Sequence, residues 1–200
     1  MIDIATMSMN TPLHYASRDG HTNAIQLLIE AGADINKKNH IEWTPLHWAS
    51  DKGHTAAIQL LIDANADVNT KSITGGTPIQ EASRKGYTNI IRLLIEADAD
   101  INEKNNRGRT PLHLASHNCH IDTIQLLIEH GADVDEEDKY KWTSLHHAAY
   151  NGHIDAIQLL IDTGADINAK DDIGRTPLHT ALDYRHTNVV QLLKSYGAQE

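Results

Sequence analysis

Four side chains that bind metals in other proteins lie within eight residues of one another, namely His113, His117, Cys119 and His120. Imidazole and thiolate are typical zinc ligands, so the cluster suggests a zinc site. His113 and His120, however, belong to two columns of histidines that recur along the chain and together hold ten of its 14 histidines. Regular recurrence indicates a structural role, and a structural zinc site needs four converging ligands. We therefore expect no metal site here.

Other patterns that could support chemistry are incomplete. Residues 98–102 resemble the opening of a calcium loop, but Glu103 stands where a glycine is needed and Arg109 where a bidentate glutamate is needed. The acidic run 135–138 is expected to be a solvated loop tip. The sequence contains no phosphate-binding glycine-rich loop, nucleophile elbow or Cys-x-x-Cys motif. We expect a protein that is not an enzyme and has no cofactor.

The elements that position these side chains repeat every 33 residues. Thr110 suits a helix N-cap, and Pro111 suits the first helical position. A fixed period of this length predicts a stack of small helical units. The counterparts of Thr110 are Thr11, Thr44, Thr77, Thr143 and Thr176.

Each copy reads as helix, turn, helix and hairpin. The second helix carries an apolar stripe, as in Ile58-Gln-Leu-Leu-Ile62, and glycine ends it in most copies. Asn65 and Asp98 take the place of that glycine in copies two and three, because both types tolerate the left-handed region. One copy buries too little apolar surface to fold alone, so stacked copies should form one domain over residues 8–200 after a lead-in at 1–7. The copies span residues 8–40, 41–73, 74–106, 107–139, 140–172 and 173–200.

Three motifs recur in phase: Thr-Pro-Leu-His at 11–14, 44–47, 110–113 and 176–179, Gly-His at 20–21, 53–54 and 152–153, and Gly-Ala-Asp at 131–133 and 164–166. With these motifs the chain resembles ankyrin repeat proteins over about residues 8–200. The resemblance implies an all-α repeat fold, an ankyrin solenoid of helix-turn-helix units joined by β-hairpin or turn loops. It also implies a non-catalytic module that binds a protein or peptide through its concave face and hairpin tips. Individual copies depart from the pattern at Gln80, Ser144, Cys119 and Arg185.

Composition constrains the setting. The formal net charge of −10 disfavours nucleic acid as a partner, because phosphate contacts dominate such binding. No apolar run approaches the roughly 20 residues of a membrane span, and the start lacks the features of a signal peptide. The single cysteine excludes an internal disulfide. We expect a monomer in the cytoplasm or nucleus, with delivery into a host cell's cytosol left open.

The columns that vary between copies indicate where a partner binds. These columns are the hairpin tip, the residue before each threonine, the residue after each motif histidine, and the two residues before each Gly-His. They hold seven of the nine aromatic residues, and tryptophan, tyrosine and arginine are enriched at interface hot spots. The predicted partner-binding residues are Tyr15, Trp43, Trp48, Arg84, Lys85, Arg107, Arg109, Tyr140, Trp142, His147, Tyr150 and Tyr184.

The layout of these residues suggests the chemistry of the partner. Aromatic residues concentrate in copies one, two, five and six, and arginine and lysine in between. We expect a protein or peptide with apolar anchors at both ends and acidic residues in the middle. Two alternatives stay open: a substrate-recruiting domain of a larger multidomain enzyme, and a host-directed pathogen effector.

Overall fold

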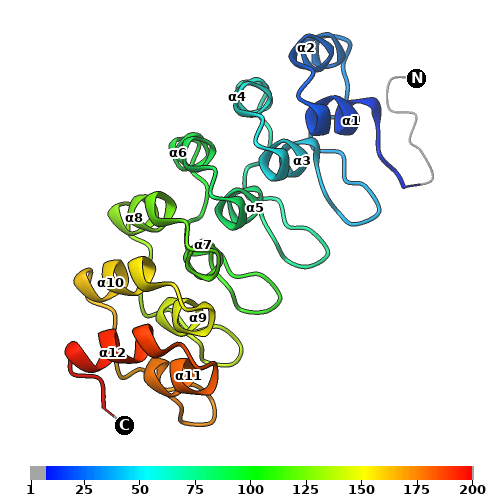
Figure 1. Ribbon diagram of the computed structural model, residues 1–200. Coiled ribbons are helices and arrows are strands. Elements are labelled where there is room, and N and C mark those ends of the chain that lie inside the picture. Colours follow the sequence, from blue (N-terminus) through cyan, green and yellow to red (C-terminus); the bar gives the residue numbers. More distant parts are fainter. Residues whose placement is uncertain (1–7, 200) are drawn as a thin grey trace. The chain divides into compact units, whose positions relative to one another are not determined.

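A computed structural model of the chain describes residues 8–199 (Figure 1). The predicted lead-in at residues 1–7 lies outside this part. Among the described residues there are twelve helices, in pairs, and no strand. None of these helices has the length and apolar character needed to cross a membrane. The helices are α1 Pro12–Asp19, α2 Thr22–Glu30, α3 Pro45–Lys52, α4 Thr55–Asp63, α5 Pro78–Lys85, α6 Thr88–Glu96, α7 Pro111–His117, α8 Ile121–Glu129, α9 Ser144–Asn151, α10 Ile154–Asp162, α11 Pro177–Asp183 and α12 Thr187–Ser195.

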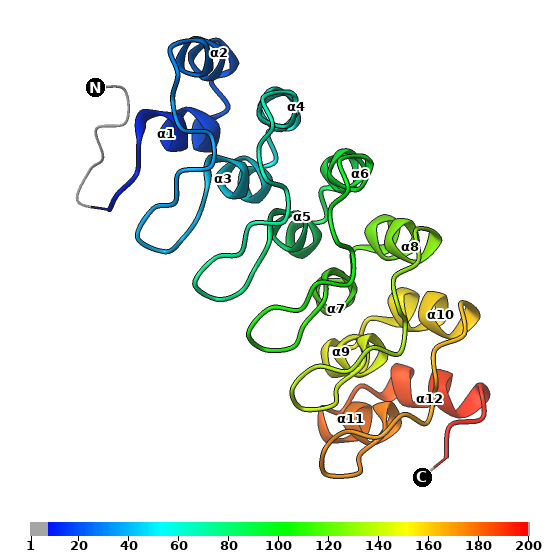
Figure 2. The same ribbon diagram turned by 180° about the vertical axis from the view of Figure 1, so that it is seen from behind.

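The described residues form two compact units. The first contains residues 8–82 and 87–100, and the second contains residues 83–86 and 101–199. Within each unit the odd-numbered helices form one row, the even-numbered helices form another, and the loops project on the side of the odd-numbered row (Figures 1 and 2). The predicted all-α stack of helix-turn-helix units is therefore confirmed, with turns in place of strands in the described loops. The assignment of residues 8–200 to one domain stays a prediction.

The first histidine column joins a layer to the next in copies one, two, four and five. In copy two, the backbone N–H of Thr44 donates to Nδ1 of His47 at 3.2 Å. The proton of the imidazole is therefore on Nε2, which donates to the carbonyl of Gly76 at 3.2 Å. Copy three has Gln80 instead, and the hydroxyl of Thr77 is buried without a hydrogen-bond partner among the described residues. The same bridge between layers is made by the pairs His14–Trp43, His113–Trp142 and His146–Arg175.

The second histidine column reaches back to the preceding layer. Nε2 of His54 lies 2.9 Å from the carbonyl oxygen of Arg18. Its ring lies so close over Gly20 that a Cβ there would be 2.6 Å from Nδ1. This contact explains the Gly-His motif, because glycine leaves room for the histidine of the next copy. Equivalent bonds join His120 to Arg84, His153 to His117 and His186 to Tyr150.

The core of each unit lies between its two rows of helices. Leu46 and Ile58 are fully buried in the first unit, and Leu145 and Ile157 in the second. A column of small side chains lets neighbouring odd-numbered helices approach closely. Its members are Ala16, Ala49, Ala82, Ala115, Ala148 and Ala181, each at most 6% exposed. The predicted left-handed residues Asn65 and Asp98 are confirmed, both at φ 63°.

Candidate partner-binding site

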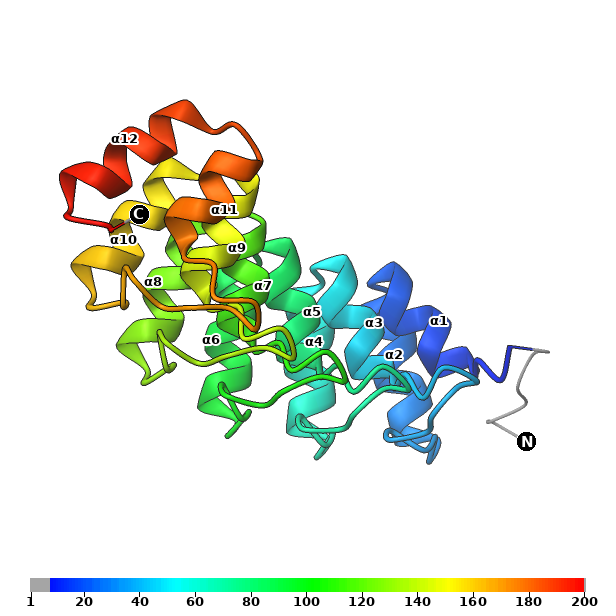
Figure 3. The ribbon, with the colours of Figure 1, turned by 90° about the horizontal axis from the view of Figure 1, so that it is seen from below.

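The second unit contains an open cavity of about 460 Å³ on the side of its loops. Three consecutive loops, which precede α7, α9 and α11, lie side by side there (Figure 3). The backbone N–H of Lys139 donates to the carbonyl of Arg107 at 3.0 Å, and that of Asp172 donates to the carbonyl of Tyr140 at 3.1 Å. These bonds hold neighbouring loops together. The lining residues are Arg107, Arg109, His117, Tyr140, Trp142, His147, Tyr150, Asp172 and Arg175.

The tip of the middle loop is closed by a buried carboxylate. Oδ1 of Asp138 accepts the backbone N–H groups of Tyr140 at 2.8 Å and of Trp142 at 3.1 Å. The loop geometry therefore places both aromatic residues at the cavity. Corresponding loops are closed in the same way by the side chains of Asn39, Asn105 and Asp171.

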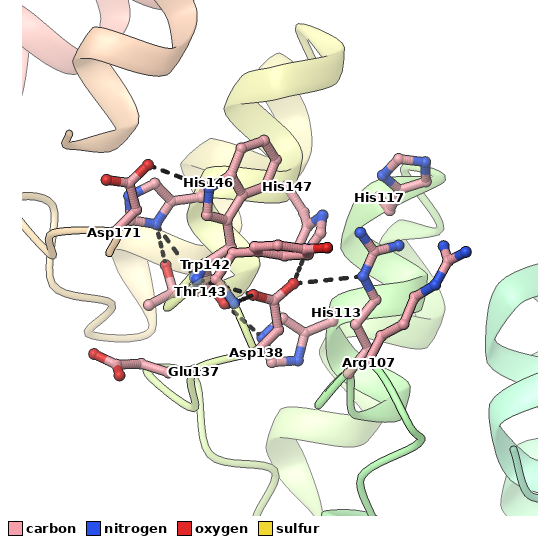
Figure 4. Close-up of polar contacts among 12 residues, drawn as sticks. Arg107, His113, His117, Glu137, Asp138, Trp142, Thr143, His146, His147 and Asp171 are labelled. Carbon is pink, nitrogen blue, oxygen red and sulfur yellow. Dashed lines mark hydrogen bonds and ion pairs between the residues drawn. The ribbon is translucent and has the colours of Figure 1, made fainter. Parts of the chain in front are cut away.

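The other oxygen of that carboxylate meets a buried histidine. Nε2–H of His147 donates to Oδ2 of Asp138 at 3.1 Å, and Nε of Arg109 lies 3.4 Å from the same oxygen. Nδ1 of His147 is buried without a hydrogen-bond partner among the described residues. Figure 4 shows Asp138, His147 and Trp142 gathered together, with Arg107 and His117 on the side of α7. Through Asp138 the pair is bonded to the backbone of the loop that carries Tyr140 and Trp142.

Burial sets the charge of His147, and hydrogen bonds set the charge of Asp138. Burial lowers the pKa of His147 to about 3, although Asp138 opposes that shift. Burial alone would raise the pKa of Asp138, but hydrogen bonds from His147 and from the backbone of Tyr140 lower it to about 2. At neutral pH the pair is therefore a neutral imidazole and an ionised carboxylate.

Aromatic rings form a continuous wall. The Trp142 ring stacks on His146 with centroids 6.2 Å apart and meets Tyr150 at 5.5 Å. The centroid of the Tyr150 ring in turn lies 6.2 Å from that of His117 and 4.3 Å from that of the exposed Tyr184. Such a wall suits a flat or apolar group from a ligand.

The arginines at the cavity differ in how far they are neutralised. Arg175 pairs with Asp171 at 3.0 Å and with Asp183 at 3.2 Å. The exposed side chains of Arg107 and Asp172 line the cavity without an ion pair among the described residues. These two charges are available to a ligand.

The first unit has its own aromatic cluster. Trp43 stacks on His47 at 5.8 Å and meets Trp48 edge-on at 4.7 Å. Nζ of Lys52 lies 5.9 Å from the centroid of the Trp48 ring. Both tryptophans are half-buried, so part of each ring stays accessible.

The structure brings together half of the predicted site residues. Tyr184 lies at the edge of the aromatic wall, whereas Arg84 and Lys85 are on α5 and do not line this cavity. Tyr15 lies on α1 in the first unit, where Cζ of Arg18 lies 5.0 Å from the centroid of the Tyr15 ring. The predicted residues that line the cavity are Arg107, Arg109, Tyr140, Trp142, His147 and Tyr150.

Two expectations need correction. His147 is not an exposed contact, because its side chain is 1% exposed at the cavity lining and bonds to Asp138. The acidic run is not wholly a solvated tip, because Asp138 is buried as the closing residue of its loop. The prediction also overlooked His117, Asp172 and Arg175, which line the cavity. All three lie in variable columns, and that signal was available in the sequence.

The three histidines of the cluster that suggested zinc are hydrogen-bonded elsewhere. Both nitrogens of His113 are bonded, to Thr110 and to the carbonyl of Trp142. Burial raises the pKa of the Cys119 thiol and disfavours its thiolate. Within residues 8–199 no three His, Cys, Asp or Glu side chains are grouped closely enough to hold a metal ion.

Comparison with known families agrees with the repeat geometry. The model of the family described as ankyrin repeats (3 copies) matches residues 3–72, 65–138 and 132–200. These segments cover nearly the whole sequence, and each is about two of the 33-residue periods long. Ankyrin repeats are in general modules of protein–protein interaction, and the family is typically non-catalytic. The chain belongs to the ankyrin repeat family.

Proposed function

We propose that the chain is a non-catalytic interaction module whose second unit binds a segment of a protein partner. The segment binds in the open cavity lined by Trp142, here called the Trp142 cavity. The observation that carries this proposal is the cavity itself, where aromatic rings from one loop and from α9 and an unpaired arginine from the neighbouring loop line the same space. Tryptophan, tyrosine and arginine are the residue types that most often dominate binding energy at interfaces. The Trp43–Trp48 cluster of the first unit supplies a second contact area.

The electrostatics of the cavity favour binding over catalysis. A general acid or base works best with a pKa near the operating pH. The pKa values of about 3 for His147 and about 2 for Asp138 lie far below neutrality. The pair therefore serves to hold the loop that carries Tyr140 and Trp142.

The arginines favour acidic groups on the partner. Arg107 offers an unpaired guanidinium, whose planar donors match a carboxylate. Assignment to the cytoplasm or nucleus rests on the single cysteine and the absence of disulfide pairing that follows from it. We further propose that the module acts as a monomer.

The test uses peptides selected for binding to the chain. Random 12-residue peptides displayed on phage are selected on the wild-type protein, and their affinities are measured by fluorescence polarisation. We expect Trp142→Ala to weaken binding about 30-fold, the effect of losing a hot spot of about 2 kcal/mol. Tyr196→Ala is the matched control, because Tyr196 is an exposed aromatic residue that does not line the cavity.

Circular dichroism must show that both variants keep the wild-type fold. Unchanged affinity of the Trp142→Ala variant would refute the proposed site. Failure to recover any peptide that binds above the unselected library would count against the cavity as well.

A further inference from the structure

The two ends of the Trp142 cavity carry opposite charge. At the end formed by the loop before α7, Arg109 pairs with Asp138 at 3.4 Å, and the exposed Arg107 has no ion pair among the described residues, so its positive charge is not neutralised. The hydrogen bonds to Asp138 keep that carboxylate ionised. This end attracts an acidic group.

At the other end, formed by the loop before α11 and by α11 itself, the balance reverses. Arg175 is the one arginine that lines the cavity here, whereas this end carries three carboxylates, two paired with that arginine and one that lines the cavity, so negative charges exceed positive ones by two. Asp171 and Asp183 pair with the arginine, while Asp172 remains exposed and unpaired. A uniformly acidic partner would be repelled at this end.

We infer that the cavity binds an extended protein segment with an acidic side chain at the Arg107 end, a basic side chain at the Asp172 end, and an aromatic or large apolar side chain between them. This inference rests on the proposed function and deepens it. It also revises the sequence-based expectation of a partner whose middle is simply acidic. The order of charges on the segment then decides which partners bind.

The repeat geometry sets the spacing of those two charges. Arg107 and Asp172 belong to loops two layers apart, and packed helices are separated by about 8–10 Å, so the two ends lie about 16–20 Å apart. An extended chain advances about 3.3 Å per residue. The acidic and basic residues of the segment are therefore about five or six positions apart.

The central position follows from the aromatic wall. Tyr140 is 57% exposed at the tip of the middle loop, and Trp142 and Tyr150 lie 5.5 Å apart behind it. A side chain that enters between the two charged ends contacts these rings. An aromatic ring or a long apolar chain would remove the most surface from water there.

The experiment compares synthetic peptides of 13 residues, each with a central tryptophan in a background of serine and threonine. One peptide has two glutamates near one end and two lysines near the other, centred five or six positions apart and made in both chain directions. The other two have the same spacing with glutamates at both ends or lysines at both ends. Affinity is measured by fluorescence polarisation at low and at moderate salt.

The mixed peptide, in its better direction, should bind wild type about twofold to fivefold more tightly than the acidic peptide, as expected for one exposed ion pair. This margin should shrink as salt rises. Arg107→Glu turns its end net negative, so the lysine-only peptide should become the tightest binder. Asp172→Lys makes the net charge of its end of the cavity zero, so the acidic peptide should bind as tightly as the mixed one.

Matched charge changes away from the cavity serve as controls. Arg92→Glu on α6 and Asp155→Lys on α10 alter exposed side chains that do not line the cavity. Neither should reorder the three peptides.

Two failures are distinguishable. Equal affinities of wild type for all three peptides, or a preference for the acidic one, would refute the charge order, while a loss of binding in Trp142→Ala would still support the proposed site. Binding of all peptides that is insensitive to Trp142→Ala would overturn the proposed function itself.

Discussion

Copies two and five present the same aromatic position in different surroundings. Trp43 and Trp142 occupy one column and stack on the motif histidine at nearly the same angle, 20° and 22°. The residue after that histidine is Trp48 in copy two and His147 in copy five, and each meets its tryptophan edge-on. The stacking of the tryptophan on the motif histidine is thus the same in both copies, and the side chain that meets the tryptophan edge-on differs.

That difference is matched by the residue that closes the loop. In copy two the closing residue is Asn39, whose amide nitrogen donates to Oδ1 of Asn10 at 2.8 Å. In copy five it is Asp138, which accepts from His147 instead. In copy two the large indole of Trp48 accompanies a neutral closing residue. In copy five the smaller imidazole of His147 accompanies an anionic closing residue and borders an open cavity. Residues that line the cavity differ as well, because Arg107, Tyr140 and Asp172 stand where Ser8, Ile41 and Ile73 stand 99 residues earlier. The charged pocket therefore depends on changes in several columns, of which these two lie closest to the tryptophan.

The largest expected difference between the two units is their response to acid. Burial lowers the pKa of His47 in the first unit to about 4, and it lowers the pKa of His113, His117, His146 and His147 in the second unit. The first unit also buries His14, which is 1% exposed. In the unfolded chain these groups titrate near 6.5, so below that pH the unfolded state binds more protons and stability falls as pH falls. Each histidine removes about 1.4 kcal/mol per pH unit down to its folded pKa.

The second unit should therefore unfold first as the pH drops from 7 to 5. The units have separate reporters: Trp142→Phe leaves tryptophan fluorescence to the first unit, and a Trp43→Phe/Trp48→Phe double variant leaves it to the second. Urea titrations at pH 7.5 and pH 5 give the midpoint for each reporter. Equal shifts of the two midpoints would show that the buried histidines do not distinguish the units.

A smaller effect is expected from exchanging the residues that close the two loops. Asp138→Asn places an amide N–H opposite Nε2–H of His147, or forces the buried imidazole to change tautomer, and should lower the free energy of unfolding by about 1–3 kcal/mol. Asn39→Asp buries a carboxylate facing the Oδ1 atom of Asn10 and should also destabilise.

The pH dependence separates the two variants. The carboxyl group introduced by Asn39→Asp has a folded pKa above its unfolded value, because protonation restores a donor for Asn10, so its destabilisation should diminish as pH falls below about 5. The Asp138→Asn variant gains nothing on acidification. Urea unfolding from pH 7.5 to pH 4.5 tests this, and parallel pH profiles for the two variants would contradict the explanation.

The sequence was sufficient to predict the fold, because the signals that carry it are local and recur. Thr110, Pro111 and the glycine caps act within one turn of helix, and the 33-residue period then implies the stacking. Even the unusual left-handed residue Asn65 was predicted from its place in the period.

The site was predicted only in part, because its details depend on contacts between copies. The variable columns indicated Trp142 and Arg107, but burial of His147 follows from how it meets Asp138, nine residues earlier in the chain. The acidic run around Asp138 has the composition of an exposed tip, and its closing role shows only when the loop column is compared across copies. The difference in charge between the two ends requires knowing which arginine pairs with which carboxylate.

The smallest effect concerns the residue before each of the two tryptophans. Glu42 and Lys141 occupy the same column and have left-handed backbones, at φ 60° and 57°. Replacing either by glycine relieves that strain, and the greater freedom of glycine in the unfolded chain offsets part of the gain. Lys141→Gly should stabilise by about 0.5–1 kcal/mol. Glu42→Gly should stabilise less, because it also removes an exposed ion pair with Lys38 at 3.5 Å.

Thermal unfolding of the two glycine variants against wild type measures both gains. The φ values of Glu42 and Lys141 indicate that the backbone before the two tryptophans is equivalent. The gain in stability from Lys141→Gly should then exceed the gain from Glu42→Gly by only the free energy of the Lys38–Glu42 ion pair, and high salt should remove the difference. A Lys141→Gly variant less stable than wild type would mean that this loop is held differently from its counterpart in copy two. The contrast between the two clusters would then lie in their backbones as well as in Trp48 and His147.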